Sequence, residues 1–171
     1  MWHRKTASKL YNLIVSTATR SALAAIILCA HVAPLFASAD TTIEKKVENG
    51  PDSSRFVIAV LAEGYTAAQQ KKFHSDVERL ITHLFESPPW QEYQNAVNVY
   101  ALFTPSEETG ADHPSNGTYV DTAFDATFDT NNIARLLTVN EAKALNAAAQ
   151  VPEFDVVIVL VNDPQYGGSG G

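Results

Sequence analysis

The sequence is poor in cysteine. Its 171 residues contain one cysteine, Cys29, and this residue lies in an N-terminal stretch that we expect to be removed on export. A protein without a pair of cysteines cannot form an internal disulfide, and a zinc site built from cysteine thiolates is excluded for the same reason. Any metal or catalytic chemistry of the remaining chain must therefore use other side chains.

Positive charge is also scarce. The chain has 12 lysines and arginines against 19 aspartates and glutamates, which gives a formal charge of -7. Nucleic-acid binding requires clustered basic side chains that neutralise phosphates, so we expect no nucleic-acid partner. A hydrophobic share of 46% excludes a disordered polyanion, and the length is typical of one domain.

Acidic residues are absent before Asp40. A basic stretch over residues 1–20 precedes an apolar run over 22–36, and the small residues at 37–39 suit a signal peptidase. This pattern predicts a signal peptide over 1–39, cleaved after Ala39, and a secreted or periplasmic protein without a stable membrane anchor. The alternative is an uncleaved anchor, because the apolar stretch approaches the length that spans a bilayer.

The rest of the chain alternates between strand and helix patterns. Residues 40–54 are polar and rich in turn formers, and we interpret them as a leader with at most one edge strand over 41–47. Six consecutive apolar residues over 56–61 predict a strand buried on both faces. A capping box at Thr66 and Gln69 and an apolar stripe of helical period predict a helix that ends at Ser87, before two prolines.

The second half repeats this alternation. We expect a strand over 96–103, a long polar loop over 104–132 and a helix over 138–150 that begins with a capping box at Thr138. A second apolar strand over 155–161 should again be covered on both faces. This order of elements predicts an α/β sandwich with a mixed, partly parallel sheet.

Histidine is too sparse to suggest a metal site. Outside the expected signal peptide only His74, His83 and His113 remain, and no His-Glu-x-x-His sequence occurs. Asp121, Asp125 and Asp129 lack the order of a calcium-binding loop, and we interpret them as turn residues. Composition and spacing therefore assign no catalytic and no metal-binding residue, and we expect no bound cofactor in this protein.

A glycine-rich stretch at 167–171 matches the Gly-x-Ser-x-Gly pattern of serine hydrolases around Ser169. That pattern requires a sharp turn from a strand into a helix, with a histidine further along the sequence. Neither a helix nor a histidine follows, so we interpret the stretch as a flexible loop. A truncated serine hydrolase remains the less favoured alternative.

Five short motifs resemble, in order and spacing, the bacterial IgA-peptidase family of zinc metallopeptidases. The first comprises Glu63, Gly64, Tyr65 and Thr66 after a buried strand, and it is similar to the family's Gly-Asp-Gly-Tyr-Thr, with Ala62-Glu63 in place of Gly-Asp. The other four, which together extend the resemblance over roughly residues 50–171, are Asn98-Val99, Ser106-Glu107 with Gly110, Asp121-Thr122-Ala123-Phe124, and Val161-Asn162 with Tyr166, Gly167, Gly168, Ser169 and Gly170.

This resemblance implies that residues 55–171 are the N-terminal part of a zincin-like (metzincin-like) catalytic domain, incomplete at its C-terminus. In the family, a helix carrying His-Glu-x-Gly-His follows the glycine-rich stretch; its histidines bind zinc and its glutamate activates the metal-bound water. The matching positions are missing here, so no catalytic residue transfers, although Tyr166 to Gly170 would be a possible substrate edge.

The resemblance therefore predicts a truncated, inactive secreted metallopeptidase. Full-length relatives would bind zinc and cleave a protein or peptide substrate, whereas this protein would acquire both properties only if completed. The alternative is a non-catalytic exported module with a binding or structural role. The oligomeric state stays open.

Overall fold

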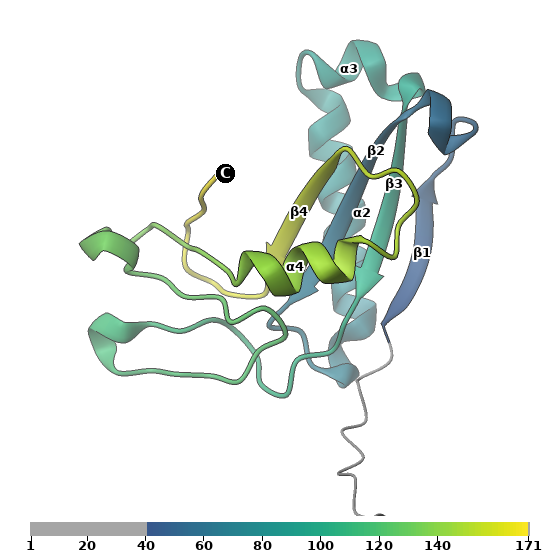
Figure 1. The fold of residues 1–171 in the computed structure, drawn as a ribbon. Helices are drawn as coiled ribbons and strands as arrows, with labels where there is room; N and C mark the ends of the chain where they lie inside the picture. The colour runs from purple at the N-terminus through teal and green to yellow at the C-terminus, as the bar shows by residue number, and fades with distance from the viewer. Residues whose placement is uncertain (1–40, 171) are drawn as a thin grey trace, which may run out of the picture. The chain divides into compact units, whose positions relative to one another are not determined.

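The computed structural model describes residues 41–170, which form a four-stranded mixed sheet with helices on both faces (Figure 1). The strands are β1 (Thr42–Val47), β2 (Phe56–Glu63), β3 (Val97–Phe103) and β4 (Val156–Val161), in the spatial order β1-β3-β2-β4. Both β3 and β4 run parallel to β2, whereas β1 runs antiparallel to β3. The predicted α/β sandwich with a partly parallel sheet is therefore confirmed.

Strand β2 lies in the middle of the core. Every residue of β2 after Phe56 is buried, because one helix layer covers each face of the sheet. Ile58 and Val60 face the layer formed by α2 (Gln70–Glu86), whereas Ala59 and Leu61 face α4 (Glu141–Ala148). Burial on both faces explains the continuous apolar run in the sequence.

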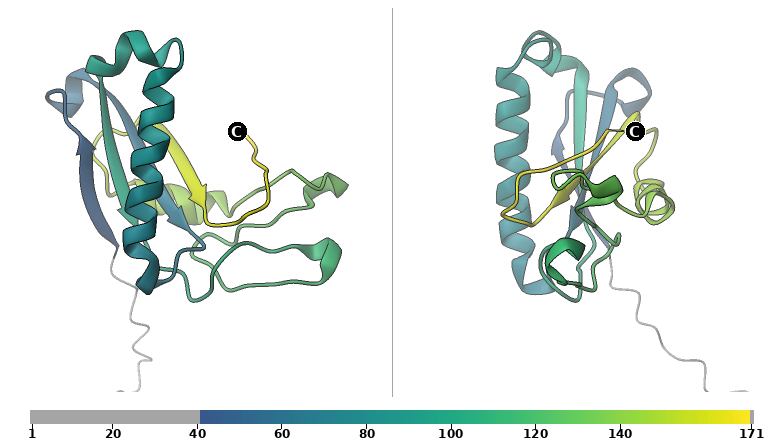
Figure 2. Two further views of the ribbon diagram at one scale, coloured as in Figure 1. Left: turned by 180° about the vertical axis from the view of Figure 1, so that it is seen from behind. Right: turned by 90° about the vertical axis from the view of Figure 1, so that its left-hand side faces the viewer.

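Helix α2 covers one face of the sheet along most of its length (Figure 2). The predicted capping box of Thr66 and Gln69 is present, and the backbone passes through a short 3-10 turn, Ala67–Gln69, before α2 begins. The buried residues Phe73 and Val77 anchor the helix to the core. A short helix, α3 (Trp90–Tyr93), follows the two prolines and leads back towards β3.

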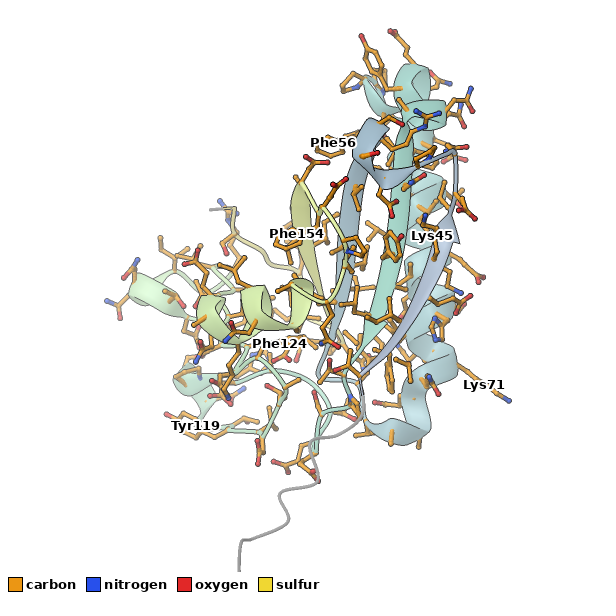
Figure 3. All side chains as sticks on the ribbon, turned by 45° about the vertical axis from the view of Figure 1, so that its right-hand side comes forward. Lys45, Phe56, Lys71, Tyr119, Phe124 and Phe154 are labelled. Atoms are coloured by element: carbon orange, nitrogen blue, oxygen red, sulfur yellow. The ribbon has the colours of Figure 1, made fainter. Side chains whose placement is uncertain are left out.

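Helix α4 begins at a different cap from the one predicted. The side chain of Asn140 accepts a hydrogen bond from the Lys143 backbone N–H, so the expected capping box at Thr138 is wrong. Thr138 instead exchanges two backbone hydrogen bonds of 2.9 Å with Thr127, which fixes it in the preceding loop. Below the helix, Phe124 packs in the same apolar cluster as α4 (Figure 3).

Strand β4 departs from the expectation of full burial. It is as apolar as β2, yet its first residue is exposed and the other five are only half-buried. Among the residues that the structure describes, it lies at one edge of the sheet and pairs only with β2. Within residues 41–170, the helices therefore cover the outer flank of β4 incompletely.

The segment expected to be a polar leader forms the opposite edge of the sheet. Strand β1 pairs with β3, and the following turn is held by Asn98, whose buried amide binds the backbone N–H of Asn49, the carbonyl of Gly50 and the carboxylate of Asp52 at 2.6–2.8 Å. Within residues 41–170, no helix is both long and apolar enough to cross a membrane. The predicted signal peptide and its cleavage after Ala39 lie outside the described residues.

Candidate functional site at the carboxyl end of the central strand

The backbone leaves β2 through a turn that only glycine can form. Gly64 has a φ of +70°, and a Cβ atom placed on it would lie 2.2 Å from the carbonyl oxygen of Gly110. The Gly110 N–H donates a 3.2 Å hydrogen bond to the Gly64 carbonyl. The two glycines therefore bring the long loop against the end of β2, at the edge of the sheet where α/β proteins place their ligands.

Glu63 is the last residue of β2, and its carboxylate is fully buried. One oxygen accepts hydrogen bonds from the Thr122 hydroxyl at 2.5 Å and the Ala126 N–H at 2.8 Å. The other oxygen accepts from the Phe124 N–H at 2.7 Å. Burial raises the pKa of Glu63 above its ordinary value, although these three hydrogen bonds oppose the shift. The carboxylate therefore holds residues 122–126 in place.

Two further motif residues connect the same strand end to its neighbours. The Ser106 hydroxyl oxygen accepts from the backbone N–H groups of Gly64 and Ala123, both at 3.0 Å. The Asn162 backbone N–H donates to the Glu63 carbonyl at 2.9 Å, and its side-chain amide donates to the Gly64 carbonyl at 3.0 Å. Four of the five separated motifs thus converge on a single point, the carboxyl end of β2.

Tyr65 has a supporting role next to this point, and Thr66 forms the capping box of the following turn. The buried Tyr65 hydroxyl donates to Asp76 on α2 at 2.8 Å, and burial together with this hydrogen bond raises the pKa of the phenol. Asp76 also pairs with Lys72 at 2.6 Å and with Arg79. Burial alone would raise the pKa of Asp76, but the hydrogen bonds from Lys72 and Tyr65 outweigh it and lower that pKa.

The glycine-rich segment after β4 lies against residues 128–137, at the end of the long loop. Gly167 packs on Phe128, where a Cβ atom would lie 2.4 Å from the ring. The Gly168 N–H donates to the Arg135 carbonyl at 3.1 Å, and the Ser169 hydroxyl donates to the Leu137 carbonyl at 2.6 Å. All five residues from Tyr166 to Gly170 are exposed. Their backbone is fixed by the loop and is still accessible to a ligand.

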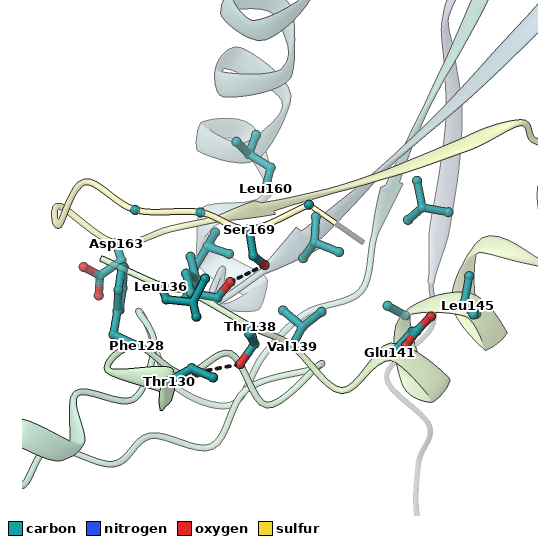
Figure 4. A pocket seen from close by; sticks show the side chains of 18 of the residues that line it. Phe128, Thr130, Leu136, Thr138, Val139, Glu141, Leu145, Leu160, Asp163 and Ser169 are labelled. Carbon is teal, nitrogen blue, oxygen red and sulfur yellow. Dashed lines mark hydrogen bonds between the residues drawn. The ribbon is translucent and has the colours of Figure 1, made fainter. Parts of the chain in front are cut away.

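A hollow of about 900 Å³ lies between this segment, β4 and α4 (Figure 4). Its walls include apolar side chains of β4, of the loop before α4 and of α4 itself, namely Val157, Val159, Leu136, Val139, Ala144 and Leu145. The hollow therefore has an apolar wall beside an uncovered sheet edge, and polar side chains such as Thr138, Glu141 and Asp163 also line it. Among residues 41–170, these polar side chains form no convergent catalytic set.

A largely buried pair of side chains links the long loop to the segment after β4. The Nε2 atom of His113 lies 2.9 Å from an Asp163 carboxylate oxygen, and its ring stacks on Phe128 at 4.8 Å. The second Asp163 oxygen accepts from the Gln165 backbone N–H at 2.8 Å. The sequence does not indicate this pair, because fifty residues separate its members and no local pattern connects them.

The remaining predicted positions make no catalytic set. Asp121 is exposed, and its backbone N–H and carbonyl both form hydrogen bonds with Glu108. Asp125 and Asp129 adopt positive φ values at turns, in agreement with their interpretation as turn residues. Ser169 lies in an irregular segment, and the backbone between β4 and residue 170 contains no helix, so the strand-to-helix turn that a serine nucleophile requires is not formed there.

The described side chains do not fit a zinc ion. Among residues 41–170, no group of three or more histidine, cysteine, aspartate or glutamate side chains is arranged to hold a metal. His113 is engaged with Asp163, whereas His74 and His83 lie on α2, next to Glu44 and Glu86. No catalytic step through a metal can be built from these residues.

A comparison with known protein families matches the part of the chain that contains the five motifs. No curated protein sequence matches the chain. The profile of a family described as IgA Peptidase M64 matches residues 45–171, which span β1 to the glycine-rich segment. Because that match covers most of the sequence, the protein belongs to the IgA peptidase M64 family and contains a metallopeptidase-type domain.

Proposed function

We propose that residues 41–170 form the N-terminal part of the catalytic domain of a secreted zinc metallopeptidase. The zinc ligands and the general base then lie outside residues 1–171, and the 171-residue protein is inactive. The family match and the lack of a His-Glu-x-x-His sequence support it. The observation that carries it is the half-exposed flank of β4.

Strand β4 consists entirely of valine, isoleucine and leucine, and five of its six residues are only half-buried. Fully burying one exposed side chain of this kind contributes about 1.5–3 kcal/mol, so completing the burial of a half-buried one contributes about half as much. Natural proteins seldom leave an apolar edge strand open, because it pairs with other chains. A further helix and strand of the same domain would cover this flank and fill the adjoining hollow.

The glycine-rich segment would then contribute to the substrate edge. Gly167, Gly168 and Gly170 carry no side chain that would keep an extended peptide away from their backbone, and hydrogen bonds to residues 135 and 137 already fix their path. Extended peptides bind such edges through main-chain hydrogen bonds. The substrate class is therefore a protein or peptide, and it would be bound productively only by the completed domain.

The proposed export rests on the N-terminal pattern of a basic stretch, an apolar run and small residues at 37–39. Mass spectrometry of exported material should find an N-terminus at Asp40. A membrane-bound product that retains Met1 would contradict cleavage of a signal peptide.

The experiment compares the 171-residue protein with a version extended by the downstream coding sequence. We expect the extended protein alone to cleave an unstructured substrate such as casein, with activity that a chelator removes and added zinc restores. The amides of Val156–Val161 should also exchange hydrogen more slowly in the extended protein. Chelator-sensitive cleavage by the 171-residue protein would refute the proposal, as would an extended protein that folds but never cleaves; the latter would favour a binding or structural module.

A further inference from the structure

The sequence contains two Asn-Gly pairs, Asn49-Gly50 and Asn116-Gly117. Asparagine followed by glycine is chemically labile in general, because glycine has no Cβ atom to hinder attack by its backbone nitrogen on the asparagine side chain. The reaction requires an exposed side chain and a backbone that can bend towards it. The surroundings of the two pairs differ in both respects.

Asn49 is held on every side. Its amide nitrogen donates to the carbonyls of Gln94 at 2.9 Å and Val97 at 2.7 Å. Its backbone N–H donates to Asn98 at 2.7 Å, and its carbonyl accepts from Arg55 at 2.7 Å. All four hydrogen bonds would restrain the rotation that brings the Asn49 side chain to the Gly50 nitrogen.

Asn116 lies at the tip of the long loop, where residues 114–119 are all exposed; Figure 3 labels Tyr119 at this outlying tip. Its side chain makes one 3.1 Å hydrogen bond, from the Thr118 N–H to its oxygen, and within residues 41–170 its amide nitrogen has no hydrogen-bond partner. In the described part of the chain, the attacking N–H of Gly117 makes a single hydrogen bond, 3.2 Å long, to the Pro114 carbonyl. Opening one weak turn therefore frees the reacting atoms.

We propose that Asn116 is a site of spontaneous deamidation and that the fold protects Asn49 from the same reaction. The Gly117 backbone nitrogen attacks the carbonyl carbon of the Asn116 amide and loses its proton, and the bond from that carbon to the amide nitrogen breaks to release ammonia. Water then opens the resulting cyclic imide at either carbonyl, which gives aspartate or isoaspartate. No reactant other than water is needed.

The change adds one negative charge at the loop tip. As isoaspartate, it also inserts an extra backbone carbon between residues 116 and 117, which the 3-10 turn Pro114–Asn116 cannot accommodate without losing the bond from Gly117. That turn adjoins His113, whose N–H and carbonyl both bond to Thr118. The modification therefore alters the part of the loop that contacts Asp163.

The test incubates the purified protein in mildly alkaline buffer and follows both asparagines by peptide mass spectrometry. We expect Asn49 to react at least about tenfold more slowly than Asn116, because protecting hydrogen bonds must first open. In urea the two rates should become similar, since unfolding removes this protection. We expect ion exchange to detect a slowly forming acidic species, and an Asn116→Gln variant should not form it.

Two results would overturn the proposal. The first is equal reaction of both asparagines in a preparation whose β2 amides are protected from hydrogen exchange. The second is an Asn116 that reacts far more slowly in the folded protein than in urea. The first would mean that the fold does not protect Asn49 more than Asn116, and the second that the fold also protects Asn116.

Discussion

Replacing Glu63 by glutamine tests whether the buried carboxylate holds the long loop. The carboxylate accepts three hydrogen bonds, from Thr122, Phe124 and Ala126. These residues lie 59, 61 and 63 positions further along the sequence. In the Glu63→Gln variant, one accepting oxygen becomes an NH₂ group. The side chain keeps the bonds from Thr122 and Ala126, but its NH₂ group then faces the Phe124 N–H, and two donors oppose each other.

The lost and weakened hydrogen bonds determine the expected loss of unfolding free energy. Leaving one buried backbone N–H without an acceptor costs about 1–3 kcal/mol, and the two remaining hydrogen bonds lose their charge assistance. Part of this loss is offset, because a neutral amide avoids the penalty of burying a charge, the same penalty that raises the Glu63 pKa. We expect the variant to lose about 2 kcal/mol of unfolding free energy.

Urea unfolding followed by circular dichroism measures this difference. With an m-value of about 2 kcal/mol/M, the midpoint should fall by about 1 M. The matched control is Glu107→Gln in the same loop, where the side chain is exposed and the change should stay within about 0.5 kcal/mol. Equal midpoints for the two variants would refute the assigned role of Glu63.

Three further predictions concern neighbouring residues. Gly64→Ala should lower the free energy of unfolding, measured in urea, by about 3 kcal/mol, because this position combines a left-handed φ with a 2.2 Å backbone clash. Gly117→Ala should lower it by only about 1 kcal/mol, because the space around its Cβ is open. Equal losses would contradict the clash. Asp76→Asn should destabilise the protein most near neutral pH, where the Asp76 carboxylate is ionised. The difference in unfolding free energy between the two proteins should shrink as pH falls below about 4, because the folded-state pKa of Asp76 is lowered and its contribution is lost on protonation. A difference that grows in acid would contradict the lowered pKa. His113→Ala leaves the Asp163 carboxylate without its ring partner, so amide exchange after β4 should accelerate; unchanged exchange would mean that the pair does not fix this segment.

Much of the fold could be predicted from local patterns. The apolar run over 56–61 and the apolar stripe of α2 each determine an element through its own residues, and the structure has both. The cap of α4 could not be predicted in this way. Thr138 and Asn140 are both good capping residues, and the backbone pairing of Thr138 with Thr127 decides between them.

The candidate site depends on contacts between distant residues. The resemblance drew attention to Glu63 and Thr122, but their hydrogen bond joins positions 59 residues apart, and no local pattern indicates it. Strands β2 and β4 have similar apolar sequences, yet β2 is almost entirely buried whereas β4 is mostly half-buried. The difference arises from their positions in the sheet, because what covers a strand is a property of the whole fold.

The most direct test of the proposed function is the zinc content of the purified protein after dialysis, measured by elemental analysis. We expect a stoichiometric zinc ion in the version extended by the downstream coding sequence and none in the 171-residue protein, whose three histidines outside the proposed signal peptide are separated or already engaged. A tightly held zinc ion in the 171-residue protein, or an extended protein that folds without zinc, would contradict this expectation.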